Sequence, residues 1–145
     1  MIVYLDTSAM LKILIDEPGM QAMREAFTGW QLAGDELVSS FLLHTEMHCA
    51  ASRRGVAAPE TIDLLLGAVG LIDIDRADLL AAARGSHRLR SADAIHLATA
   101  LAGLRSADAI HLATALAVDA DVLVTFDAEL ADAAAGEGLR ALSPA

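Results

Sequence analysis

Short apolar runs rich in β-branched residues alternate along this chain with longer segments whose apolar residues recur at helical spacing. The short runs predict strands at Ile2 to Leu5, Glu36 to Ser39, Leu71 to Ile74, Val122 to Phe126 and Leu139 to Leu142. The longer segments predict helices over residues 9–16, 20–28, 40–54, 59–69, 76–87 and 129–135. Because strand and helix alternate, we expect an α/β fold whose central sheet is mainly parallel and has about five strands.

One segment is present twice. Residues 89–102 read Leu-Arg-Ser-Ala-Asp-Ala-Ile-His-Leu-Ala-Thr-Ala-Leu-Ala, and residues 104–117 repeat these letters with only Gly103 between the copies. Each copy predicts a helix that a serine can cap, with an aspartate, Asp93 or Asp108, in its first turn. The sequence therefore contains two identical helices, and the second one extends the helical region.

Length and composition are those of a single domain spanning residues 1–145. Apolar residues make up 55% of the chain and aromatic residues 3%, which predicts a core of aliphatic side chains. The net charge is −10 and Lys12 is the single lysine, so the chain lacks the basic surface typical of nucleic-acid-binding proteins. An RNA partner would therefore require a cation to neutralise it.

Cysteine usage and hydropathy bear on the compartment. The single cysteine, Cys49, excludes an internal disulfide and suits a reducing environment, and we expect it to be buried beside Ala50. No apolar run approaches the roughly 20 residues of a membrane span, and Asp6 follows the N-terminal apolar run too early for a signal peptide. These features predict a cytoplasmic protein without a membrane partner.

Acidic residues follow the two most apolar strands. Asp6 and Asp127 come at the carboxyl ends of their strands, where ligands bind in open parallel sheets. Asp93 or Asp108 would begin a helix on the same side, and Glu46 lies beside an apolar stripe of the helix over residues 40–54. Carboxylates that converge raise one another's pKa unless a cation binds them, and oxygen ligands favour Mg²⁺ or Mn²⁺. The pattern therefore predicts metal-assisted hydrolysis of a phosphodiester.

Each of these acids also has a purely structural explanation. Asp6 and Asp127 could cap the helices that follow them, and Asp93 and Asp108 are favourable at a helix N-terminus in any fold. Glu46 could extend from the edge of its apolar stripe into solvent. Only the coincidence of all these acids at one end of one sheet favours a site.

Several of these segments together resemble a known family. Asp6-Thr7-Ser8-Ala9, Glu46, the repeated Ser-Ala-Asp-Ala-Ile-His-Leu-Ala-Thr-Ala and Thr125-Phe126-Asp127 are similar to the PIN-domain ribonucleases, specifically the VapC toxins of bacterial toxin–antitoxin pairs. The resemblance covers nearly the whole chain and implies an α/β/α sandwich that cleaves RNA endonucleolytically and is inhibited by a cognate antitoxin. It also implies a Mg²⁺ or Mn²⁺ site with supporting hydroxyl groups. The implied ligands are Asp6, Glu46, Asp127 and the aspartate of one repeat copy, and the supporting residues are Thr7, Ser8 and Thr125.

The duplication departs from the family pattern, which has one copy. We favour Asp108 over Asp93 as the ligand, because the spacing from Asp108 to Asp127 matches the pattern. The copy that is not used would leave isoleucine and leucine side chains without a core, since burying each is worth roughly 1.5–3 kcal/mol. We therefore expect self-association as a homodimer or a larger assembly, exchange of this segment between chains, or a looser native state.

The histidines suggest further interpretations. His44 and His48 are four residues apart around Glu46, a spacing that can bind zinc, although the order His-x-Glu-x-His is not that of a zinc protease. His96 and His111 come three residues after their aspartates, so either could hydrogen-bond near the site, but we expect them on a helix surface.

Two other functional classes remain open. A Mg²⁺-binding receiver domain would need a lysine after a late strand, and Lys12 is too early in the chain. A domain in which the duplication has blocked catalysis would retain only the binding of a partner such as the antitoxin.

Overall fold

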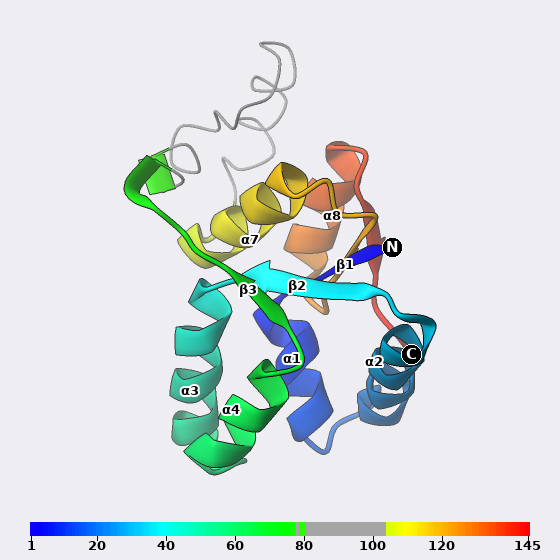
Figure 1. The fold of residues 1–145 in the computed structure, drawn as a ribbon, viewed down its shortest axis with the longest axis vertical. Coiled ribbons are helices and arrows are strands. Elements are labelled where there is room, and N and C mark those ends of the chain that lie inside the picture. The colour runs from blue at the N-terminus through cyan, green and yellow to red at the C-terminus, as the bar shows by residue number, and fades with distance from the viewer. Residues whose placement is uncertain (78, 81–103) are drawn as a thin grey trace.

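The computed structural model describes residues 1–77, 79–80 and 104–145, which form a five-stranded sheet with helices on both faces (Figure 1). All strand pairs are parallel, and the strand order is β3-β2-β1-β4-β5. The strands are β1 (Ile2–Leu5), β2 (Glu36–Ser40), β3 (Gly70–Ile72), β4 (Val122–Val124) and β5 (Arg140–Leu142). The predicted α/β class and parallel sheet are thus confirmed.

Burial on both faces explains why the central strands are continuously apolar. In β1, Val3 and Leu5 belong to the core on one face of the sheet, and Tyr4 belongs to the core on the other face. The same alternation recurs in β4, where Val122 and Val124 lie opposite Leu123. A parallel sheet covered by helices on both sides requires apolar residues at every position of its central strands.

Two helical layers cover the sheet. One layer contains α1 (Thr7–Leu14), α2 (Met20–Ala33), α3 (Leu42–Arg54) and α4 (Pro59–Leu66), and the other contains α7 (Ser106–Ala117) and α8 (Ala128–Gly136). In Figure 1 the two layers lie on opposite sides of β1 and β2. The arrangement is the α/β/α sandwich that the sequence predicted.

The strand order creates a switch point beside β1. From β1 the chain moves outward through β2 to β3, and it then returns to add β4 and β5 on the other side of β1. Connections therefore leave β1 and β4 in opposite directions, and in open parallel sheets such a point forms the ligand-binding crevice at the carboxyl ends of the strands. Asp6 and Thr125 follow these two strand ends directly.

Some helix boundaries differ from the prediction for local reasons. Ser40 is the last residue of β2 and not a helix start, because its amide is held by the Tyr4 hydroxyl at 2.9 Å. The serine of the second copy, Ser106, is the first residue of α7 and does not cap it. The predicted helix over 76–87 and the first repeat copy lie mostly or wholly outside the described residues. In the part of the chain that is described, no helix has the length and apolar character needed to span a membrane.

Candidate functional site

Asp6 is the most deeply buried acidic residue of the crevice, with 3% of its surface exposed. Its Oδ1 accepts hydrogen bonds from the Ala9 amide at 2.8 Å and the Ser8 hydroxyl at 2.8 Å, so that Asp6, and not Thr7 or Ser8, is the N-cap of α1. Its Oδ2 accepts from the Thr125 hydroxyl at 2.7 Å. Burial raises the pKa of Asp6 even though these donors and the nearby His111 act to lower it. A carboxylate has about four acceptor positions, and three donated protons leave room for one further ligand.

Hydroxyl groups join the ends of β1 and β4. The Ser8 hydroxyl accepts from the Phe126 amide at 2.7 Å, while the Thr125 hydroxyl accepts from the Asp127 amide at 3.0 Å. Ser8 and Thr125 each also donate to Asp6. These short polar side chains therefore fix the position of Asp6 relative to the loop that carries Asp127.

Asp127 and Asp108 stand at helix N-termini near Asp6. Asp127 caps α8 by accepting a hydrogen bond from the Leu130 amide at 3.0 Å, and Asp108 lies in the first turn of α7. Partial burial raises the pKa of Asp108, and the negative charges of Asp127 and Asp6 raise it further. Asp108 therefore lies close enough to Asp127 and Asp6 for their charges to act on it.

Glu46 reaches the same crevice from α3. Its Oε2 accepts hydrogen bonds from the Thr7 hydroxyl and from His111 Nε2, the latter at 2.8 Å. Burial acts to raise the pKa of Glu46, but the hydrogen bonds from His111 and Thr7 together outweigh burial and lower the pKa. Glu46 is thus held as a carboxylate, and it does not extend freely into solvent.

His111 is central to this network and is 2% exposed. Its Nδ1 lies 3.0 Å from the Tyr4 hydroxyl, and that hydroxyl already accepts from the Ser40 amide. The Glu46 carboxylate can only accept, so its contact with Nε2 places a proton on that nitrogen, and in the neutral imidazole Nδ1 then accepts the proton of the Tyr4 hydroxyl. Burial raises the pKa of Tyr4 to about 12, so the phenol remains a donor.

The prediction that His111 lies on a helix surface is wrong. Spacing contained the missed signal, because Asp108, His111, Leu112 and Ala115 recur on one face of α7, and the last three are buried. Tyr4 was missed as well, since a phenol within an apolar strand gives no sign of its hydrogen-bond partners. Cys49, predicted to be buried, is exposed.

The described residues bring Asp6, Asp108, Asp127 and Glu46 to one crevice, together with Thr7, Ser8 and Thr125. Asp93, the alternative from the first copy, lies outside the described residues. The four acids do not form a tight cluster, because no three of them have ligand oxygens within 4.8 Å of one another in the described structure. Glu46 does not join His44 and His48, since it is bonded to Thr7 and His111.

The crevice has the chemistry of a site for a hard divalent cation. Its charged ligands are carboxylate oxygens, and the raised pKa values of Asp6 and Asp108 show that their ionised forms are disfavoured without a counter-charge. Mg²⁺ and Mn²⁺ bind such oxygens through one or two carboxylates and retain several waters, so a loose group of acids is sufficient. The residues present therefore fit such an ion.

Comparison with known families agrees with this geometry. The model of the PIN domain matches residues 3–136, which include β2, β3, β4, all of β1 but its first residue, and all of the acids described above. The chain belongs to the PIN-domain family. PIN domains are generally nucleases and typically use a divalent metal, so the family part of the sequence resemblance is confirmed. No curated protein matches the chain. The carboxyl-end crevice of this PIN domain is accordingly its candidate active site.

Proposed function

We propose that this PIN domain is a Mg²⁺- or Mn²⁺-dependent endoribonuclease that acts as the toxin of a toxin–antitoxin pair. The observation that carries the proposal is the approach of Asp6, Asp127 and Asp108 at the switch point of the sheet, where the charges of Asp127 and Asp6 add to burial in raising the pKa of Asp108. The toxin role, the RNA substrate and the antitoxin partner rest on the VapC-like motifs of the sequence.

We assign each acid a role in metal binding from its position in the crevice. Asp6, Asp108 and Asp127 would hold the metal, with Asp93 as the alternative to Asp108 from the first copy. Glu46, kept ionised by His111 and Thr7, would add negative charge at the side of the site or complete the ligand set. When bound, the ion would activate a water molecule and polarise the phosphodiester. The hydroxyls of Ser8 and Thr125 would hold Asp6 in place during the reaction.

Substrate binding must overcome the net charge of −10. Arg105 is exposed directly before α7, and its charge acts on Asp108, so it lies where it could contact a phosphate next to the metal. Arg53 and Arg54, at the end of α3, are exposed too. A few arginines next to a metal ion would give weak and strongly salt-dependent RNA binding.

The nuclease proposal is tested with a covalently closed, circular single-stranded RNA and Mn²⁺. A circle has no ends, so its linearisation reports endonucleolytic cleavage alone. We expect cleavage by the wild type and loss by at least about 100-fold in Asp6→Asn and Asp108→Asn, because each removes a ligand charge from the metal. Asp93→Asn makes the same change in the identical copy and is the matched control, for which we expect wild-type cleavage.

The outcomes separate the alternatives. Cleavage that survives Asp6→Asn would exclude the assigned site, and loss in Asp93→Asn alone would assign the metal to the first copy. A wild type that binds Mn²⁺ and cuts no RNA would favour the binding-only function.

For the toxin role we expect induced expression to arrest bacterial growth with the wild type and not with Asp108→Asn. Light scattering tests the expected self-association.

A further inference from the structure

A second group of potential metal ligands lies between α3 and α4. His44 and His48 extend from α3, and Asp63 extends from α4. His48 Nε2 is 2.8 Å from Asp63 Oδ1, and His44 Nε2 is 3.9 Å from the same oxygen. Among the described residues, these three form the group of histidine, cysteine and acidic side chains whose ligand atoms all lie within 4.8 Å of one another.

This group is separate from the acidic crevice. Glu46 is two residues from each histidine on α3, and two residues correspond to about 200° around a helix, so the histidines point away from Glu46. Glu46 faces Thr7 and His111, whereas the histidines face Asp63 of α4. One helix thus carries a ligand of the proposed nuclease site on one side and the three-residue group on the other.

The distances suit a tetrahedral zinc ion. Zinc bonds of about 2.0–2.2 Å to nitrogen and oxygen place two tetrahedral ligand atoms about 3.3 Å apart. The observed separations of 2.8 Å and 3.9 Å lie on either side of that value. Shifts of about half an ångström in the two contacts with Asp63 would bring each nitrogen–oxygen separation to that value.

A simple hydrogen bond between α3 and α4 accounts for only part of this arrangement. It explains His48 and Asp63, but it leaves His44 directed at the same oxygen without a bond to it. The His44 ring is stacked on Phe41 with centroids 5.4 Å apart and planes 10° apart, so its orientation is restricted. The rings of His44 and His48 are 4.7 Å apart, which is the arrangement of two imidazoles that can share one ion.

We propose that His44, His48 and Asp63 form a Zn²⁺ site that joins α3 to α4. Two imidazoles and one carboxylate suit zinc, whereas the oxygen-only crevice suits Mg²⁺ or Mn²⁺, so the two sites select different metals. Three protein ligands leave the fourth position to water or an exogenous ligand. The proposal does not depend on the nuclease function.

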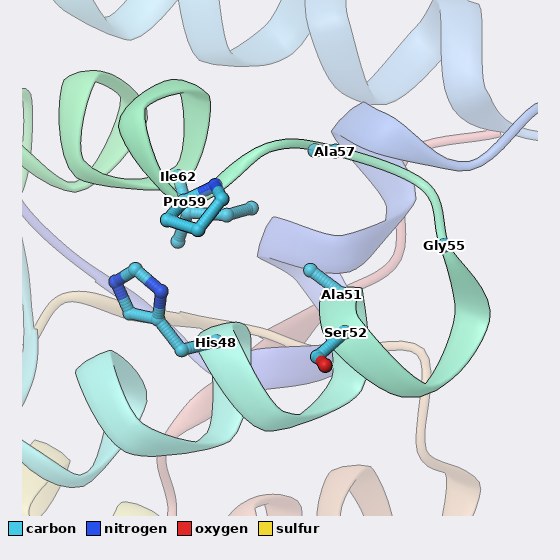
Figure 2. Close-up of a pocket in the computed structure, with 7 residues that line it drawn as sticks. All are labelled: His48, Ala51, Ser52, Gly55, Ala57, Pro59 and Ile62. Atoms are coloured by element: carbon cyan, nitrogen blue, oxygen red, sulfur yellow. The ribbon is translucent and has the colours of Figure 1, made fainter.

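The surroundings favour an exchangeable ion that stiffens the structure. Figure 2 shows the His48 ring turned toward Pro59 and Ile62 of α4, where it lines a cavity of about 250 Å³. Asp63 is largely exposed and the two imidazoles are partly exposed, so zinc could enter directly from solvent. Bound zinc would hold α3 against α4 and so restrict the helix that carries Glu46.

The test measures zinc affinity of the full chain by competition with a chromophoric chelator, with excess Mg²⁺ present to occupy the acidic crevice. We expect one tightly held Zn²⁺ per wild-type chain. Replacing a supporting partner of a metal ligand typically costs 10–100-fold in affinity, so removing a direct ligand in His48→Gln or Asp63→Asn should cost about 100-fold or more. Glu60→Gln removes one exposed acid from the same helix as Asp63 and should leave the affinity unchanged.

X-ray absorption at the zinc edge supplies a second measurement. We expect two imidazoles and one carboxylate oxygen at about 2.0–2.2 Å in the wild type. Circular dichroism checks that each variant is folded, and the double variant His44→Gln/His48→Gln replaces any single variant that is not. Equal zinc affinity in the wild type and the folded ligand variants would overturn the proposal, as would a wild type that binds no zinc.

Discussion

The ends of β1 and β4 are built from similar residues, yet their acids have different roles. Asp6 and Asp127 both follow an apolar strand, and both cap the next helix. Asp6 directly follows its strand, is buried and has both oxygens occupied by donors. Asp127 comes three positions after the last residue of β4, is only partly buried, and uses one oxygen for its cap.

The difference shows how one crevice accommodates several negative charges. At the end of β4, the position nearest the strand belongs to Thr125, whose hydroxyl donates to Asp6 where a second carboxylate would repel it. The acid of β4 is thereby displaced outward, beside Asp108. Asp6 is therefore a structural residue and a candidate ligand at once, whereas Asp127 and Asp108 should contribute mainly charge.

The largest effect is expected for Asp6→Ala. This change leaves the Ser8 and Thr125 hydroxyls and the Ala9 amide without their acceptor, and it should lower the free energy of unfolding by about 2–4 kcal/mol. Urea denaturation measures the loss. Asp6→Asn is the matched control, because asparagine retains the cap and should recover part of the stability but none of the RNA cleavage. An Ala variant as stable as the wild type would contradict the structural role of Asp6.

Thr125→Val should have the next largest effect, because it breaks the connection between the two strand ends. The change keeps the side-chain shape, removes a donor from Asp6 and leaves the Asp127 amide without its acceptor. We expect a loss of about 1–3 kcal/mol in urea denaturation. Thr125→Ser retains the hydroxyl and should lose much less. Equal losses in both variants would mean that packing of the methyl group, and not the hydrogen bonds, matters at this position.

Asp127→Ala should lower the free energy of unfolding by about 1 kcal/mol, which is less than Asp6→Ala or Thr125→Val, because it removes one helix cap from a partly exposed position. Asp127→Asn keeps a good cap and should be close to the wild type in stability. Both variants lose the charge, so cleavage of RNA with Mn²⁺ should fall in both. The comparison fails if Asp127→Ala proves as destabilising as Asp6→Ala.

Asp108→Asn should change stability least, and with a sign that depends on pH. The folded pKa of Asp108 is raised above its ordinary value of 3.8, so the folded protein binds this proton more tightly than the unfolded chain does. The resulting contribution to the free energy of unfolding is fully present below that value and is lost as pH rises through the folded pKa. Between pH 4 and pH 7, the free energy of unfolding of Asp108→Asn should therefore rise relative to that of the wild type. The rise should be less than about 1 kcal/mol, because solvent screens this half-exposed group.

Urea denaturation at both pH values, with a chelator present, measures this gain of Asp108→Asn. Excess Mg²⁺ should reverse its sign, because the ion stabilises the ionised wild type by binding to it. A variant that loses stability relative to the wild type at pH 7 in the chelator would show that repulsion at Asp108 is not significant.

Local patterns in the sequence were sufficient to predict most of the helices and strands and the edge of the sheet at which the acids lie. The apolar runs at β1 and β4 have no polar positions because both faces of these strands are buried, so they could be recognised without a structure. The acids after them could be predicted to share an edge, because parallel strands end on the same side. The resemblance to PIN domains rests on these same local motifs.

Only the tertiary structure decided which side chains meet. The strand order places β1 next to β4 and so brings Thr125 to Asp6 across 119 positions of sequence. Packing of α7 turns His111 inward to Tyr4 and Glu46 and places Asp108 where the charge of Asp6 acts on it. The pairing of His48 with Asp63 likewise depends on how α3 packs on α4. Local sequence specifies the secondary structure, but long-range packing selects the partners, because their interaction depends on distances that spacing along the chain does not contain.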